Sequence, residues 1–201
     1  MEMRAISMAD VDLVPEIAWA LTQYRKAHRR GELAKNSVRR QDYQRWSVIW
    51  QRLGPGDSLI DVGVGVGQLV NAAGHFNRFP QVTGLDYYWQ TRLQRLSDTV
   101  RFELCDLTAP EAAAYRADVV TCLECIEHIP DPGFEAAVAN LHAMYRRKLI
   151  VSVPFCEAEP LYKGHHQRFT AARLRELFPG AALTVLLLER QAHWAMVEIT
   201  R

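Results

Sequence analysis

The stretch that decides the fold is LIDVGVGVG, residues 59–67. An apolar run with Asp61 near its end predicts a buried strand, and Gly63, Gly65 and Gly67 follow directly. Glycines between a strand and a helix let a ligand approach bare backbone, and a helix N-terminus offers free N–H groups to a polar or anionic ligand. The spacing is Gly-x-Gly-x-Gly, which differs from the Gly-x-Gly-x-x-Gly of dinucleotide-binding folds. This stretch therefore predicts a ligand site at the end of a central strand.

Outward from the glycines, short apolar runs alternate with longer amphipathic stretches as far as the C-terminus. This alternation is typical of βαβ units and a parallel sheet, so the sequence predicts an α/β fold. The last two apolar runs are joined by too few residues for a crossover helix, and we expect them to form an antiparallel hairpin at one sheet edge. The seven expected strands cover residues 58–62, 81–85, 100–104, 117–122, 148–153, 182–189 and 193–200.

Residues 1–56 follow another pattern. Apolar residues recur at helical spacing over about residues 10–30 and again over 38–53, and Gly54-Pro55-Gly56 ends the second run. The sequence therefore predicts a helical N-terminal extension over residues 1–56 and an α/β domain over residues 57–201. Within that domain the clearest helix is expected over residues 133–147.

Composition excludes several classes of protein. The 201 residues have room for one ordinary domain, and 24 Lys and Arg nearly balance 23 Asp and Glu, which argues against a uniformly basic surface that coats nucleic acid. Four cysteines are too few for a disulfide framework in a chain of this size, so a reducing cytoplasm is expected. The chain has neither an apolar N-terminal signal region nor an uncharged apolar run long enough to cross a bilayer.

Two further acidic residues follow the next predicted strands. Asp86 ends the second strand and Asp106 follows the third. Because the carboxyl ends of parallel strands meet at one edge of the sheet, both should join Asp61 in the crevice where open α/β sheets bind ligands. A carboxylate at Asp86 can accept both hydroxyls of a ribose, and one at Asp106 can accept the exocyclic amine of an adenine.

With these residues in place, residues 58–201 resemble the class I S-adenosylmethionine-dependent methyltransferases. The first motif of that family, acidic-x-Gly-x-Gly-x-Gly, is matched from Asp61 to Gly67. The resemblance implies a Rossmann-like, doubly wound, mostly parallel sheet of seven strands, with the N-terminal helices as a lid over the cofactor. It also implies that S-adenosylmethionine is the cofactor, with the residues that bind it being Asp61, Gly63, Gly65, Gly67, Asp86, Asp106, Leu107 and Leu123.

A second cluster follows the fourth predicted strand. Glu124, Glu127 and His128 are spaced i, i+3 and i+4, so one helical turn can direct all three to a common point. Carboxylate oxygens with an imidazole suit Mg²⁺, Mn²⁺ or Zn²⁺, and His165 or His166 can supply a fourth ligand.

This cluster is similar to the Glu-x-x-Glu-His and later His of two groups of enzymes, ubiquinone-pathway O-methyltransferases and small-RNA 3′-end 2′-O-methyltransferases. The run Lys163-Gly164-x-His166 is nearer to the first group, which favours His166 as the later ligand. The alternative is a site without metal, in which His128 or His166 acts as a general base or substrate contact beside Glu127.

Three other features carry weaker expectations. Cys122-x-x-Cys125 is interpreted as a pair of packing cysteines because it has no second pair. Tyr24 and Tyr43 are the candidates on the N-terminal helices for lining the acceptor site. The pairs Arg29-Arg30 and Arg39-Arg40 flank the connection between those helices and favour an acidic or phosphorylated acceptor.

Together these patterns predict an S-adenosylmethionine-dependent methyltransferase, with an oxygen of a small molecule as the expected acceptor. The alternatives are a metal-dependent RNA 2′-O-methyltransferase and a cofactor-binding protein without catalysis. We expect a small-molecule acceptor as partner, no nucleic acid and no membrane span, and we leave a homodimer open. The expected catalytic residues are His128, His166 and Glu127, and the expected metal ligands are Glu124, Glu127, His128 and His166.

Overall fold

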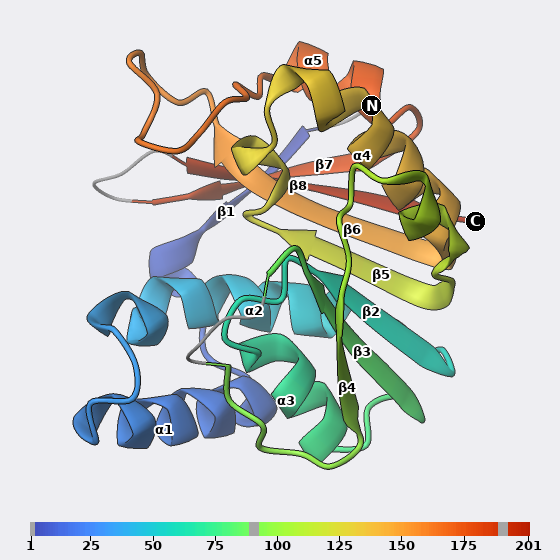
Figure 1. Cartoon of the computed structure of the whole chain (residues 1–201). Coiled ribbons are helices and arrows are strands. Elements are labelled where there is room, and N and C mark those ends of the chain that lie inside the picture. The colour runs from blue at the N-terminus through green and yellow to red at the C-terminus, as the bar shows by residue number, and fades with distance from the viewer. Residues whose placement is uncertain (1–2, 89–92, 189–192) are drawn as a thin grey trace.

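The computed structural model describes residues 3–88, 93–188 and 193–201. In these parts of the chain, eight strands form one sheet with the order β1-β7-β8-β6-β5-β2-β3-β4 (Figure 1). All neighbouring strands are parallel except β8, which runs antiparallel to both β6 and β7. The strands are β1 (Met3–Ser7), β2 (Ser58–Val62), β3 (Gln81–Asp86), β4 (Val100–Leu104), β5 (Ala117–Leu123), β6 (Tyr145–Phe155), β7 (Ala182–Leu187) and β8 (His193–Thr200).

Helices cover both faces of the sheet. Figure 1 shows α1, α2 and α3 together on one side and α4 and α5 on the other. Neighbouring residues of the central strands face opposite sides, so that Leu59 packs in the core under the first group and Ile60 in the core under the second. Burial on both faces explains why these strands are continuous apolar runs. The helices are α1 (Pro15–Arg29), α2 (Arg40–Arg52), α3 (Gln68–His75), α4 (Asp131–Met144) and α5 (Ala171–Leu177).

The predicted α/β architecture is confirmed, including the closing antiparallel hairpin of β7 and β8. The prediction of seven strands is wrong by one, because β1 pairs in parallel with β7 and extends the sheet at that edge. Several element bounds also differ from the expected ones. The helix expected over 133–147 ends at Met144, since Tyr145 is buried and begins β6. The strand expected over 182–189 ends at Leu187, and residue 189 lies outside the described residues.

The segment before residue 57 is therefore a strand followed by helices. Both α1 and α2 pack in the same apolar core as β2 and α3. Tyr24 of α1 is fully buried, and its hydroxyl donates to the Val66 carbonyl at 2.8 Å. That contact ties α1 to the glycine loop, while the division of the chain at residue 56 stays a prediction. None of the helices in the described residues is long and apolar enough to span a membrane.

Candidate functional site

The glycine loop between β2 and α3 needs glycine for two different reasons. Gly63 has φ +72° and Gly65 has φ +58°, a region that L side chains rarely adopt. A Cβ at Gly63 would lie 2.6 Å from Cys125 Sγ, so this position is closed by packing. A Cβ at Gly65 would meet no atom within 4 Å, so this position faces open space. The bare backbone near Gly65 is therefore accessible to a ligand.

Asp86, at the end of β3, holds this loop. One carboxylate oxygen, Oδ2, accepts a hydrogen bond from the Gly65 backbone N–H at 2.9 Å. The N–H groups of Gly63 and Val64 donate to the Leu85 carbonyl at 2.8 and 3.0 Å. The end of β3 thus fixes the glycine loop, and Asp86 lies beside the open position as the sequence predicts for a ribose-binding carboxylate.

Asp61 is a buried carboxyl on the floor of the site. Its side chain is 5% exposed, and Oδ1 accepts a hydrogen bond of 2.6 Å from the Thr121 hydroxyl. Burial raises the pKa of Asp61 to about 7, against the opposing effect of the Thr121 hydrogen bond. The group therefore titrates near neutral pH, and above that pH the protein has to bury a carboxylate charge.

We predict that Asp61→Asn becomes more stabilising as the pH rises. The folded protein binds the Asp61 proton more tightly than the unfolded chain does, so wild-type stability falls between about pH 4 and pH 7. Asparagine keeps an acceptor for Thr121 and has no charge to bury. The stability difference between variant and wild type should grow by about 2 to 3 kcal/mol from pH 5 to pH 8. Urea unfolding at both pH values measures it, and a difference independent of pH would contradict the burial argument.

The other predicted cofactor residues occupy distinct environments. Asp106 is exposed, and its Oδ1 accepts hydrogen bonds from the Thr108 N–H at 2.9 Å and the Thr108 hydroxyl at 2.7 Å. Leu123 lines the cavity described next. Leu107 is 6% exposed and packs in the core on the α4 side, so it does not share that lining.

A cavity of about 1020 Å³ opens at the carboxyl ends of β2, β5 and β6. The glycine loop forms one wall, the start of α2 and the turn before it form another, and residues after β5 and β6 complete it. The side chains that bring charge or an aromatic ring into this lining are Arg39, Asp42, Arg45, Trp46, Asp61, Glu124, Glu127, His128, Glu157, Tyr162, His165 and Trp194.

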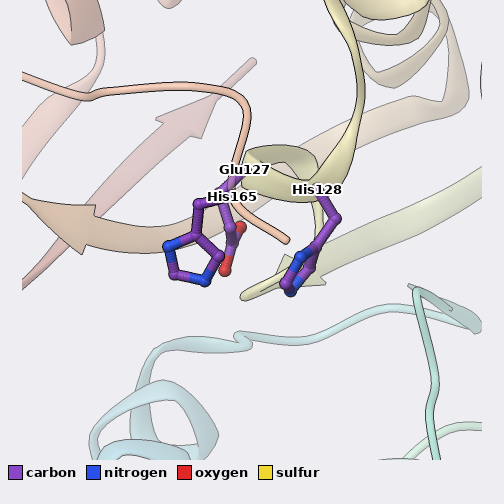
Figure 2. Close-up of side chains that lie close together, drawn as sticks. All are labelled: Glu127, His128 and His165. Atoms are coloured by element: carbon purple, nitrogen blue, oxygen red, sulfur yellow. The ribbon is translucent and has the colours of Figure 1, made fainter. Parts of the chain in front are cut away.

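Three side chains in this cavity converge. Glu127 and His128 come from the helical turn after β5, and His165 comes from the loop after β6 (Figure 2). Their ligand atoms all lie within 4.8 Å of one another. We call these three residues the Glu-His-His group.

Both histidines of the group have one nitrogen already engaged. The Gly164 carbonyl lies 2.9 Å from His128 Nδ1, and a Glu157 carboxylate oxygen lies 2.7 Å from His165 Nδ1. A carbonyl or carboxylate oxygen can only accept, so each Nδ1 carries the hydrogen. In the neutral ring the free lone pair is then on Nε2.

Glu127 is the buried member of the group. Its residue is 1% exposed, and Oε2 has no hydrogen-bond partner among the described residues. Burial raises the pKa of Glu127 well above its usual range, and the nearby Glu124 carboxylate raises it further. A buried carboxylate oxygen without a partner is costly, and a cation or a donor in the cavity would satisfy it.

The structure differs from the predicted ligand set at two positions. The side chain of His166 is exposed and lies outside the group, because the backbone N–H groups of His166 and Gln167 both donate to the Glu127 carbonyl and direct His165 inward instead. Glu124 is also outside the group. Its carboxylate lies 3.0 Å from the Arg45 guanidinium and accepts from the Ser152 hydroxyl at 3.1 Å.

The Glu-His-His group fits a divalent cation, and its unsatisfied Glu127 oxygen supports that fit. It offers one carboxylate oxygen and two imidazole nitrogens, while Mg²⁺ prefers oxygen ligands alone. Imidazole nitrogen suits Zn²⁺ and Mn²⁺ better. With Glu124 paired to Arg45, the remaining candidate ligands are of a type that suits a transition metal better than Mg²⁺.

Several expectations about the N-terminal helices are corrected by the packing. Tyr24 and Tyr43 are fully buried, with both hydroxyls donating to backbone carbonyls, so neither lines the cavity. Trp46, one turn from Tyr43, lines it instead. Of the two arginine pairs, Arg39 reaches the lining. The helical stripe in the sequence identifies these aromatic residues but not which of them faces the core.

Sequence reasoning also missed Arg45. This residue of α2 is 4% exposed, and its guanidinium lies 4.2 Å from the ring centre of Trp194 in β8 and close to Glu124. The three residues are far apart in sequence, and a single arginine carries no local sign of burial. Only the packing of α2 against the end of the sheet brings them together.

Comparisons with known proteins show the family and the fold. A family model described as a methyltransferase domain matches residues 27–193. The ubiquinone biosynthesis O-methyltransferase of Escherichia coli O157:H7 is 36% identical over 97 residues, which cover 44% of this chain and 40% of that protein. The enzyme of the same name from Stutzerimonas stutzeri is 39% identical over 85 residues, covering 39% of this chain and 36% of the relative. The matched segments thus span well under half of these relatives.

Two solved structures share the fold. Magnesium protoporphyrin IX methyltransferase (ChlM) from Synechocystis PCC 6803, solved with bound SAH, superimposes with a TM-score of 0.59 at 21% identity, covering 78% of each chain. The small RNA methyltransferase HEN1 gives a TM-score of 0.62 at 16% identity, covering 79% of this chain and 25% of that one. At these identities the likeness concerns the fold.

Proposed function

The chain belongs to the methyltransferase-domain family, and from this premise we propose that it transfers the methyl group of S-adenosylmethionine to an oxygen of a small molecule. One observation carries the proposal. The glycine loop and the Glu-His-His group line the same cavity, at the carboxyl ends of neighbouring strands. A cofactor on the loop would therefore share that cavity with an acceptor held at the group.

The cofactor is proposed to bind as follows. The methionine part lies over Gly63 and Gly65, with open backbone at Gly65, and the second oxygen of Asp86 accepts from the ribose hydroxyls. The exposed Asp106 is available to the adenine amine. The buried Asp61 lies below the loop, where a cationic amino group would offset its charge. The ligand named with the Synechocystis enzyme, SAH, is the demethylated form of this cofactor.

The reaction requires little covalent chemistry from the protein. The methyl group is already activated on a sulfonium, so the chain must align an acceptor oxygen with it and handle one proton. Glu127 Oε2 and the Nε2 atoms of His128 and His165 would hold a divalent cation, which supplies Lewis-acid polarisation of the acceptor hydroxyl. Without a cation, Nε2 of either histidine has the lone pair to accept the hydroxyl proton.

The acceptor is proposed to be a small molecule. Net charge is +1, and the cavity is bounded by the start of α2 and by the loop after β6, which supports a compact acceptor over a nucleic acid. Arg39 is the basic residue of the predicted pairs that lines the cavity, and it would meet an acidic group on the acceptor. The four cysteines, all free, support a cytoplasmic setting, and a homodimer stays a prediction.

A transfer assay tests the proposal. Purified protein and S-adenosylmethionine labelled with tritium in its methyl group are mixed with fractions of cellular metabolites, and in a parallel arm with small RNA. We expect label in small-molecule fractions, released as methanol by mild base if the product is a methyl ester, or as methyl iodide by hot hydriodic acid if it is a methyl ether. Label in the RNA arm alone would favour the RNA alternative. Tight binding of S-adenosylhomocysteine without transfer to any fraction would support the alternative of a cofactor-binding protein without catalysis.

Metal removal gives a separate prediction. Dialysis against EDTA is expected to reduce turnover at least tenfold, and Mn²⁺ or Zn²⁺ should restore it better than Mg²⁺, because two of the three ligands are imidazoles. Binding of S-adenosylhomocysteine should be unchanged, since the glycine loop does not use the cation. Full activity in chelator would assign the group to proton transfer without metal.

A further inference from the structure

Glu157, two residues after β6, uses its two carboxylate oxygens for different partners. Oε1 accepts the Tyr162 backbone N–H at 3.0 Å, and Oε2 accepts the His165 Nδ1–H at 2.7 Å. The side chains of Glu157 and His165 are only 13% and 11% exposed. One carboxylate therefore fixes both the turn of this loop and the imidazole that the loop carries.

The backbone next to His165 has anchors besides Glu157. The His166 N–H donates to the Glu127 carbonyl at 2.7 Å, and the Gly164 carbonyl accepts from His128. These bonds set where the backbone of His165 lies, but they do not set the orientation of its ring. Rotation about the bond from Cβ to the ring, or movement of the proton to Nε2, would remove the lone pair from the Glu-His-His group.

We propose that Glu157 is the positioning residue that fixes the tautomer and orientation of His165, so that Nε2 presents its lone pair to Glu127 and His128. Figure 2 shows the His165 ring beside the Glu127 carboxylate. This inference rests on the proposed function for its consequence in catalysis, but the tautomer is a property of the protein alone.

The loop supplies a matched control. Glu159 lies two residues further along, its side chain is 75% exposed, and its contact is with Arg168 at 3.6 Å. Replacing it removes the same charge from the same loop without touching His165. Glu157→Gln is an intermediate variant, because it has one acceptor oxygen for two donors, the Tyr162 N–H and the His165 Nδ1–H.

The first experiment reads the tautomer directly. Long-range ¹H–¹⁵N correlation spectra of ¹⁵N-labelled protein, assigned with His165→Gln, should show wild-type His165 protonated on Nδ1 with Nε2 unprotonated. Glu157→Ala should lose this pattern, while Glu159→Ala should keep it. An unchanged tautomer in Glu157→Ala, or protonation on Nε2 in the wild type, would overturn the proposal. Thermal unfolding of each variant confirms that a folded protein is compared.

The second experiment uses Zn²⁺ binding by calorimetry, without cofactor or acceptor. Loss of an outer carboxylate partner typically weakens metal affinity 10- to 100-fold, and we expect a loss of about that size for Glu157→Ala, a smaller one for Glu157→Gln and none for Glu159→Ala. Equal Zn²⁺ affinity in Glu157→Ala and wild type would also overturn the proposal. If wild type binds no Zn²⁺, the metal part of the proposed function fails, and the tautomer spectra alone decide the role of Glu157.

Discussion

Replacing Asp86 with alanine is expected to weaken binding of S-adenosylhomocysteine at least tenfold. The carboxylate of Asp86 holds the Gly65 N–H at 2.9 Å, and we propose that its other oxygen accepts from the ribose hydroxyls. Hydrogen bonds to a charged group contribute about 1.5 to 3 kcal/mol each, so losing even one of them costs about a factor of ten. Calorimetric titration with S-adenosylhomocysteine measures the loss.

The control for this variant is Asp98→Ala. Asp98 is also acidic but exposed, and it precedes β4 at the opposite end of the parallel strands, so its removal should leave the affinity unchanged. Asp86→Asn should lie between alanine and wild type, since the amide oxygen can still accept one hydrogen bond. If Asp86→Ala bound S-adenosylhomocysteine as tightly as wild type, the proposed contact between Asp86 and the ribose would be wrong.

Replacing Glu127 with glutamine is expected to reduce turnover roughly 100-fold or more while leaving the protein as stable as wild type or more so. The substitution removes the carboxylate of the Glu-His-His group, and a Lewis acid at that position would supply several kcal/mol to the transition state. Stability should not fall, because Glu127 is 1% exposed with an unpartnered Oε2, and a neutral amide is less costly to bury.

This opposite response of activity and stability separates a functional role from a structural one. Methyl transfer and urea unfolding are measured on the same preparations, with Glu135→Gln on the exposed face of α4 as control. A parallel loss of turnover and stability would show that Glu127 supports the fold, and unchanged turnover would remove the group from the proposed mechanism.

The sheet was predictable because its signal is local. Each of β2 to β8 is visible in the sequence as an apolar run, and the glycines after β2 mark the turn at the centre of the site. β1 has no such signal. Met3–Ser7 contains both an arginine and a serine, and most of its residues are exposed. Its partner strand, β7, lies near the other end of the sequence. Edge strands of this kind depend on long-range pairing, which a local pattern does not reveal.

The site, too, was predictable only where its signal is local in the sequence. Glu127 and His128 follow from a spacing within five residues, and the structure brings them together. Which later histidine joins them depends on the register of the loop after β6, and that register is fixed by hydrogen bonds to the Glu127 carbonyl. The exclusion of Glu124 depends on Arg45, which approaches from α2. Local spacing therefore identifies the candidate ligands, and contacts between distant segments determine which of them come together.

The position of β1 has a consequence for how the chain folds during synthesis. Its hydrogen-bonding partner β7 is made only after every other described strand except β8. β1 therefore has no partner strand while the centre of the sheet forms. Its pairing is expected to be among the last events of folding. Since α1 follows closely and packs beside the glycine loop, the order of assembly links completion of the outer edge of the sheet to completion of the cofactor site.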